Sequence, residues 1–131
     1  MLCFYVVKNF THSKSNRAKY FYRRFMTAST RIQQIQEMLK SEPNDSFLNY
    51  ALAIEYAKLN DVEKAIEIIE ALLKRDENYL GAYYQLGHYY EQLEQPEAAI
   101  NIYNKGIFIA KQQNNKKTLG ELNEALWMLE D

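Results

Sequence analysis

The sequence predicts an all-α fold in which helix pairs of similar sequence stack side by side as a solenoid. Residues 51–56 align with residues 85–90, and residues 61–66 align with residues 95–100, both at an offset of 34 residues. A fixed period of this length is typical of a helix–turn–helix unit stacked on copies of itself. The chain has 131 residues with only four glycines and two prolines, which suits a single helical domain.

The beginning of the chain differs in charge from the remainder. Seven basic residues precede the first acid, Glu37, whereas the chain after Arg31 has nine basic residues and seventeen acids. The seven are Lys8, Lys14, Arg17, Lys19, Arg23, Arg24 and Arg31. The acidic remainder makes nucleic acid an unlikely partner for the domain, because phosphate binding requires positive charge.

We expect residues 1–25 to be a basic extension that is disordered or not native, with translation beginning at Met26. A flexible arm is an alternative, because basic and aromatic residues alternate before Met26, as they do in segments that bind nucleic acid or anionic surfaces. A targeting peptide is the third interpretation, although the apolar stretch at residues 2–7 is too short for a secretory signal. No apolar run approaches the roughly 18 residues of a membrane-spanning helix, so we expect no membrane association.

A first helix is predicted from Ser29 or Thr30, because apolar residues then recur at the spacing of one helical face. The helix ends before Pro43, since proline disfavours a helical conformation in the residue that precedes it. The polar turn that follows offers an N-cap for the next helix at Asp45 or Ser46. The apolar face consists of Ile32, Ile35, Met38 and Leu39.

Two helix pairs are predicted next, at about residues 46–79 and 80–113. In the first pair, Asp61 follows a tight turn and caps the second helix. In the second pair, Pro96 lies in the first turn of the second helix, where its missing N–H is not needed. A last helix at about residues 117–130 has leucines on one face and glutamates on the other, and we expect it to cover the exposed end of the stack.

With these two units the chain resembles the tetratricopeptide repeat family. The resemblance rests on small residues where the two helices of a pair cross, and on larger residues at the seams between pairs. The small residues are Ala53, Ala65, Gly87 and Ala99, and the large ones are Leu52, Tyr56, Ile69, Leu86, Tyr90 and Tyr103. The resemblance covers residues 46–113. It implies a right-handed α-α superhelix at residues 26–131, made of a half repeat, two full repeats and a capping helix.

In this family the first helices of successive repeats line a concave groove that takes an extended peptide or a helix. By position, the resemblance implies a tyrosine-lined groove and a non-catalytic adaptor that binds a partner protein. The groove residues are Phe47, Tyr50, Ile54, Ala57, Lys58, Gly81, Tyr84, His88, Glu91 and Gln92. Aromatic side chains with a few polar groups are typical of binding hot spots. The alternative for Tyr50 and Tyr84 is that they only shield the N-terminal helix or the capping helix.

Chaperone-binding members of the family hold a terminal carboxylate with lysines and asparagines at these positions. This chain has Tyr50, Ile54, Tyr84 and His88 at four of them. Charge-assisted hydrogen bonds to a carboxylate need fixed donors, so we expect a partly apolar segment of a partner protein instead. The alternative function is a self-associating structural module, in which the chain forms a homodimer or larger homo-oligomer.

Catalysis and metal binding have few candidate residues. His88 and Glu91 are three residues apart on one predicted helix, and Glu55 comes from the preceding repeat. A metal site needs three or four ligands, and the second histidine, His12, lies in the basic extension. We therefore expect no enzyme activity, no metal and no cofactor. The single cysteine, Cys3, suits the reducing cytoplasm, which is the expected location.

Trp127 lies off the apolar face of the last predicted helix. We expect its ring to fold over Ile107 or Phe108 at the end of the stack. The alternative is that Trp127 is exposed and contributes to pairing between copies.

Overall fold

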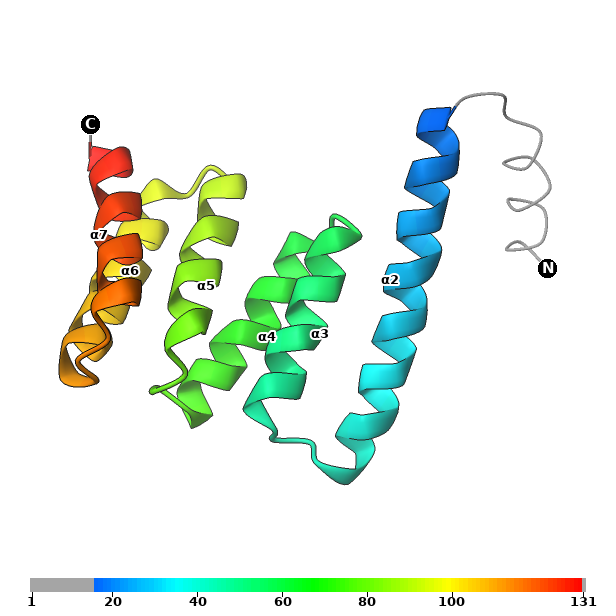
Figure 1. Ribbon diagram of the computed structural model, residues 1–131, viewed down its shortest axis with the longest axis horizontal. Helices are drawn as coiled ribbons and strands as arrows, with labels where there is room; N and C mark the ends of the chain where they lie inside the picture. The colour runs from blue at the N-terminus through cyan, green and yellow to red at the C-terminus, as the bar shows by residue number, and fades with distance from the viewer. Residues whose placement is uncertain (1–15, 131) are drawn as a thin grey trace.

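The computed structural model describes residues 16–130, and within them the chain is an all-α helical solenoid (Figure 1). The helices follow one another as neighbours in space, from α2 at one end of the row to α7 at the other. Their bounds are α2 Asn16–Ser41, α3 Ser46–Lys58, α4 Val62–Arg75, α5 Leu80–Gln92, α6 Pro96–Gln112 and α7 Lys116–Glu130. The most extensive contacts join α3 to α4 and α5 to α6, which are the two predicted helix pairs.

The helix starts agree with the predicted capping residues. The Asp45 carboxylate accepts a hydrogen bond from the backbone N–H of Leu48 at 2.7 Å, so Asp45 is the N-cap of α3. The Asp61 carboxylate accepts one from the N–H of Lys64 at 3.2 Å at the start of α4. Pro96 begins α6. The two aspartates each accept a hydrogen bond from a backbone N–H that has no partner within its helix, and the proline has no such N–H.

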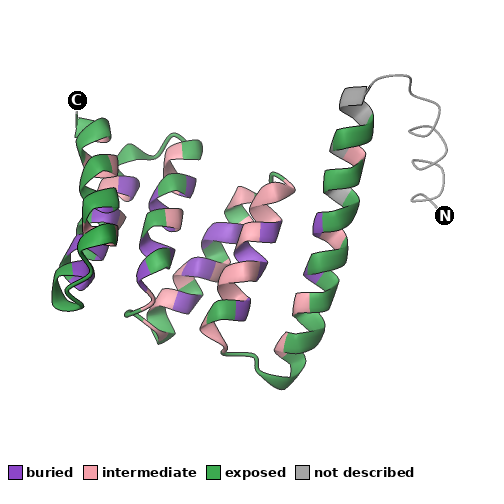
Figure 2. Cartoon of the chain, in the orientation of Figure 1, coloured by how far each residue is buried: buried purple, intermediate pink, exposed green. Residues whose placement is uncertain are grey.

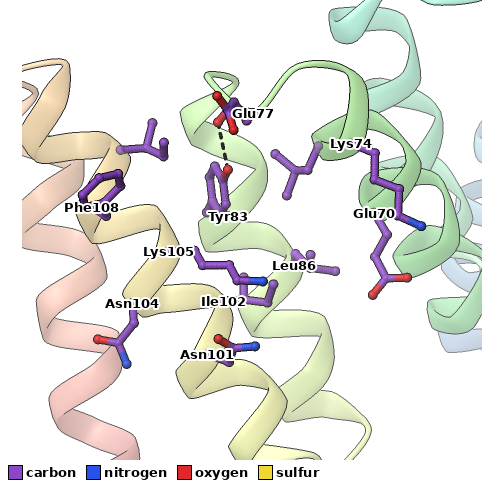
Figure 3. A pocket seen from close by; sticks show the side chains of 12 residues that line it. Glu70, Lys74, Glu77, Tyr83, Leu86, Asn101, Ile102, Asn104, Lys105 and Phe108 are labelled. Carbon is purple, nitrogen blue, oxygen red and sulfur yellow. Dashed lines mark hydrogen bonds between the residues drawn. The ribbon is translucent and has the colours of Figure 1, made fainter.

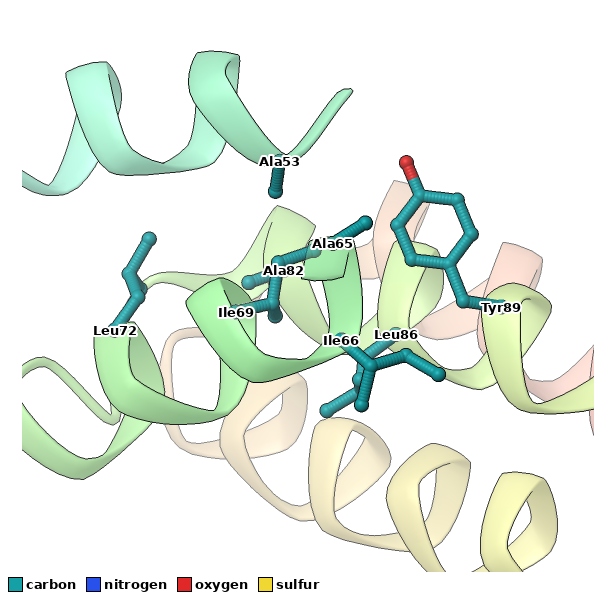
Figure 4. Packing of buried hydrophobic residues seen from close by; sticks show 8 residues of the cluster. All are labelled: Ala53, Ala65, Ile66, Ile69, Leu72, Ala82, Leu86 and Tyr89. Carbon is teal, nitrogen blue, oxygen red and sulfur yellow. The ribbon is translucent and has the colours of Figure 1, made fainter. Parts of the chain in front are cut away.

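Small residues lie where the helices of each pair approach most closely. Ala53, Ala65 and Ala99 are fully buried, and in Figure 4 the two first-repeat alanines lie in a cluster with larger apolar side chains. Gly87 faces the ring of Tyr103 so closely that a Cβ atom at Gly87 would lie 2.1 Å from its Cε1. These contacts confirm the alignment of small and large residues from which the repeat was recognised.

The interior of the solenoid lies mainly in the two helix pairs. Figure 2 shows buried positions concentrated in α3 to α6, whereas α2 and α7 are largely exposed. Within the described residues of α2, only Ala28 and Ile32 are buried. No helix in residues 16–130 has both the length and the apolar character required to span a bilayer.

The predicted start of the first helix is wrong, because α2 begins at Asn16 rather than at Ser29 or Thr30. The Thr27 hydroxyl donates to the backbone oxygen of Arg23 at 2.7 Å, and the Thr30 hydroxyl donates to that of Met26 at 2.9 Å. Threonine and serine bond in this way inside helices as well as at caps. Residues 16–25 of the expected extension are therefore helical, and the expectations for residues 1–15 lie outside the described part of the chain.

The expected position of Trp127 is also wrong. Its side chain is 64% exposed and that of Phe108 is 61% exposed, so neither residue covers the other. The end of α6 is covered instead by Leu122, which is fully buried and lies against Gly106. Trp127 is three residues before the end of the described chain, on the outward side of α7, where no further helix of residues 16–130 reaches it.

Candidate functional site

The predicted groove residues of α3 differ in exposure. Phe47 is 67% exposed, whereas Tyr50 and Ile54 are half-buried. The Tyr50 ring lies 5.4 Å from the ring of Tyr79, measured between centroids, in a tilted arrangement. Tyr50 therefore packs against the turn that leads from the first repeat to the second.

The predicted residues of α5 do come together. Tyr84, His88 and Glu91 line one cavity of about 350 Å³, whose other walls come from α6 and α7. Tyr84 is 41% exposed, and its ring lies 6.3 Å from that of Tyr103. The fourth predicted residue of this helix, Gln92, has its side-chain nitrogen 3.1 Å from Nε2 of His88.

The remaining wall of this cavity belongs to α7. Glu121, Glu124 and Met128 line it, together with Tyr103 and Ala125. Its lining therefore includes the carboxylates of Glu91, Glu121 and Glu124 and no lysine or arginine, and we call it the acidic cavity. An enclosed surface of one charge sign concentrates its field and attracts the opposite charge.

Glu91 has a fixed position in the acidic cavity. The Tyr103 hydroxyl donates a hydrogen bond to the Glu91 carboxylate. Burial raises the pKa of Tyr103 above its ordinary value, and the hydrogen bond to Glu91 raises it further. The hydroxyl thus remains protonated at neutral pH and keeps the carboxylate directed into the cavity.

The sequence interpretation missed the contribution of α7 because this helix was taken as a cap. The spacing of its leucines was an available indication: Leu122 and Leu126 are four residues apart, as are Leu86 and Tyr90 of α5. A first helix of a further repeat carries its large residues at this spacing. That comparison would have placed Glu121 and Glu124 of α7 beside His88.

A second cavity, of about 370 Å³, lies at the opposite end of the same row of helices. Arg23, Arg24 and Arg31 of α2 line it with Lys58 of α3, and we call it the basic cavity. The expectation that the chain before Met26 is not part of the domain hid Arg23 and Arg24. The acidic and basic cavities thus give the two ends of the solenoid opposite charge.

Glu55 is the one carboxylate in the lining of the basic cavity and is only 6% exposed. Its Oε1 atom accepts from the Lys58 ammonium at 2.7 Å and lies 3.4 Å from an Arg31 nitrogen. Its Oε2 atom is buried and has no hydrogen-bond partner among the described residues. Two cations thus compensate the buried charge, as buried carboxylates require.

The combination of His88, Glu91 and Glu55 considered for catalysis is not assembled. Glu55 lines the basic cavity, whereas His88 and Glu91 line the acidic one. Within residues 16–130, no three side chains of His, Cys, Asp or Glu gather as metal ligands would.

A third cavity, of about 730 Å³, lies between α4 and α6, the second helices of the two repeats (Figure 3). Figure 3 shows Glu70, Lys74 and Lys105 around it, with the exposed ring of Phe108 at one side. The Tyr83 hydroxyl donates to the backbone oxygen of Glu77 at 2.8 Å. Because both charge signs occur along this lining, it offers no preference for a charged ligand.

Comparisons with known proteins agree with this geometry. A family model described as tetratricopeptide repeat matches residues 48–79 and 80–113. A tetratricopeptide repeat domain protein from Salinibacter ruber, solved by NMR, is 39% identical; the match covers 67% of this chain and 89% of that one, with a TM-score of 0.65. No curated protein matches the chain.

Two more distant structures show the same fold. The first is the TPR2B-domain:pHsp70 complex of yeast Sti1, whose matched chain is 19% identical with a TM-score of 0.71. The match covers 87% of the present protein and 94% of the Sti1 chain. PcrH, a Pseudomonas aeruginosa protein solved in complex with the chaperone binding region of PopD, is 13% identical, with 90% and 94% covered and a TM-score of 0.70.

Proposed function

This chain belongs to the tetratricopeptide repeat family, and from that premise we propose that it is a non-catalytic adaptor that binds a segment of a partner protein in the groove of its first helices. Members of the family are in general interaction modules rather than enzymes. The fold neighbours support the proposal, because Sti1 and PcrH were both solved in complexes with other proteins or their segments. A chain with one cysteine suits the cytoplasm, where we propose that it acts.

The observation that carries the proposal is the acidic cavity, in which an exposed tyrosine lies beside three carboxylates. Tyr84 supplies apolar contact area, and Met128, which is 69% exposed, adds a flexible apolar surface on the opposite wall. A carboxylate ligand would be repelled by Glu91, Glu121 and Glu124. The preferred partner segment therefore brings apolar side chains and at least one cation, and contacts the groove through both.

Partner capture from a lysate of the source organism tests this proposal. The parent chain is compared with the double variant Tyr84→Glu/His88→Glu, which adds charge to the groove without removing a buried side chain. The matched control is Phe108→Glu, an exposed aromatic position beside the α4–α6 cavity. We expect a partner that the parent and the control capture and that the double variant loses. Equal capture by all three chains would contradict groove binding.

The alternative function is self-association without a separate partner. It predicts that the parent captures only further copies of itself and that its mass in solution rises with concentration. Capture distinguishes the two functions, because an adaptor retains a different protein, whereas a self-associating module retains only copies of itself.

A further inference from the structure

The N-terminal half of α2 extends beyond the helix that it packs against. α2 has 26 residues, whereas α3 has 13 and runs antiparallel beside its second half. At about 1.5 Å per residue, α2 exceeds α3 by roughly 20 Å, and Figure 1 shows this overhang beyond the turn between α3 and α4. We call residues 16–27 the α2 arm. Among the helices of residues 16–130, α3 reaches it with its C-terminal end, where Glu55 and Lys58 line the basic cavity with arm residues.

The α2 arm presents basic and aromatic side chains to solvent. Lys19, Arg23 and Arg24 are exposed, and Tyr20 is 73% exposed. Positions three and four residues apart lie on one helical face, so the cations and the ring form a single surface. The sequence has no acid before Glu37, so no carboxylate within the helix offsets this charge along the arm.

The acidic cavity complements this surface in charge and in composition. Its carboxylates would face the arginines, and the exposed Tyr84 and Met128 would contact the tyrosine ring and the aliphatic parts of the arginine side chains. The Lys117 ammonium lies 4.0 Å from Glu121, but this exposed pair contributes little and can exchange for a better one. Helix-in-groove binding of this kind is a common recognition mode.

The two surfaces cannot meet within one copy of the chain. The helices α3 to α6 separate α2 from α7, and the two lie at opposite ends of the row in Figure 1. Contact between them therefore requires two copies. Since the surfaces are different from one another, the interface is heterologous, and each copy has one free arm and one free groove with which to continue.

We propose that the α2 arm of one copy docks in the acidic cavity of a second copy, so that the protein assembles head to tail. The proposal rests on the proposed function, because it names the occupant of the same groove. Since the attraction is largely between exposed charges, assembly weakens as salt shortens the screening length. The arm can release the groove to a partner segment of similar chemistry, which makes assembly and partner binding compete.

Charge reversal on each surface tests the proposal with the full chain. Arg23→Glu/Arg24→Glu reverses the arm, and Glu121→Lys/Glu124→Lys reverses the cavity. We expect the parent to assemble at low salt, and each variant alone to lose on the order of tenfold or more in self-affinity, measured by analytical ultracentrifugation. An equimolar mixture of the two variants should assemble again. The reversed arm of the first variant meets the reversed cavity of the second, and the unchanged arm of the second meets the unchanged cavity of the first.

The matched control is Glu63→Lys/Glu97→Lys. It makes the same change in net charge as Glu121→Lys/Glu124→Lys, at two exposed glutamates that line none of the three cavities. Glu63 and Glu97 occupy equivalent positions in the two repeats. The control should assemble like the parent. Circular dichroism of every variant establishes that the helices are intact.

Three outcomes would overturn the proposal. The first is a parent that remains monomeric at low salt up to its solubility limit; if Tyr84→Glu/His88→Glu still loses a captured partner, the groove proposal survives while this one fails. The second is assembly that both charge reversals leave unchanged, which would place the interface elsewhere, for instance at Trp127. The third is a monomeric parent whose arm binds duplex DNA in a salt-dependent manner, which would assign the arm to nucleic acid.

Discussion

Gly87 lies where α5 crosses α6, and the ring of Tyr103 fills the space that a side chain would need. A Cβ atom there would lie 2.1, 2.5 and 2.7 Å from three ring carbons. Tyr103 is only 1% exposed, so its ring has little room to move. We expect Gly87→Ala to destabilise the fold by about 1–3 kcal/mol, the usual cost of overpacking a core.

Gly120 provides the control for this prediction, because a Cβ atom there would meet nothing within 4 Å. Within α7, replacing this glycine by alanine should stabilise the chain by about 0.5–1 kcal/mol. Urea unfolding followed by circular dichroism measures both changes. Equal effects at the two positions would mean that α5 and α6 do not cross at Gly87.

Glu94 lies in the turn after α5, and its φ of 57° is in the left-handed region that residues other than glycine and asparagine rarely adopt. Asparagine occupies the same conformation at position 60, the equivalent point of the first repeat, where φ is 64°. We expect Glu94→Gly to raise the free energy of unfolding by about 1 kcal/mol. Asn60→Ala should lower it, and the opposite result at either position in denaturant unfolding would contradict the assigned turn.

At the scale of the helix, α2 combines a packed half with an exposed half. Its described buried residues, Ala28 and Ile32, both follow Met26. We expect a chain of residues 26–131 to unfold within about 0.5 kcal/mol of the parent, since changes to exposed surface rarely exceed that. Ile32→Ala, which removes a buried side chain, should cost clearly more. Thermal unfolding by circular dichroism compares the two, and a large loss on truncation would show that the α2 arm stabilises the domain.

The helices that the sequence predicted well are those whose burial imposes a pattern. In α3 to α6, apolar residues recur because each helix contacts two neighbours, and Asp61 and Pro96 mark two of the starts. The α2 arm lacks such a pattern because, among the described helices, it is reached by the C-terminal end of α3 rather than by a helix along its length, so periodicity could not reveal it. Its alanine, lysine and arginine content favours a helix without tertiary contacts, but only weakly.

The candidate site was predicted in part for a similar reason. Tyr84, His88 and Glu91 were found by position, because the repeat fixes which residues of α5 face the groove. Glu121 and Glu124 were missed because α7 follows the second repeat at a shifted spacing, so alignment at 34 residues does not reach it. The charge difference between the ends of the solenoid depends on α2 and α7 together, and only their arrangement in space makes it visible.

For the molecule as a whole, buried tyrosines link stability to alkaline pH. Burial raises the pKa of Tyr89 to about 12, and burial with the hydrogen bond to Glu70 raises the pKa of Tyr90 to about 12. Burial also raises the pKa of Tyr103. Because the folded state holds these protons more tightly than the unfolded chain, the stabilisation is complete below the unfolded pKa of 10.0 and is lost as pH rises toward 12.

We therefore expect the free energy of unfolding to be nearly constant from neutral pH to about pH 9.5 and to fall above pH 10, by at most about 1.4 kcal/mol per pH unit for each tyrosine. The double variant Tyr90→Phe/Tyr103→Phe should start less stable, because it loses hydrogen bonds to Glu70 and Glu91. Its stability should nevertheless decline less steeply, because two of the tyrosines with a raised pKa are gone. Urea unfolding at a series of pH values measures both slopes, and parallel slopes would mean that tyrosine ionisation does not limit the alkaline stability of the solenoid.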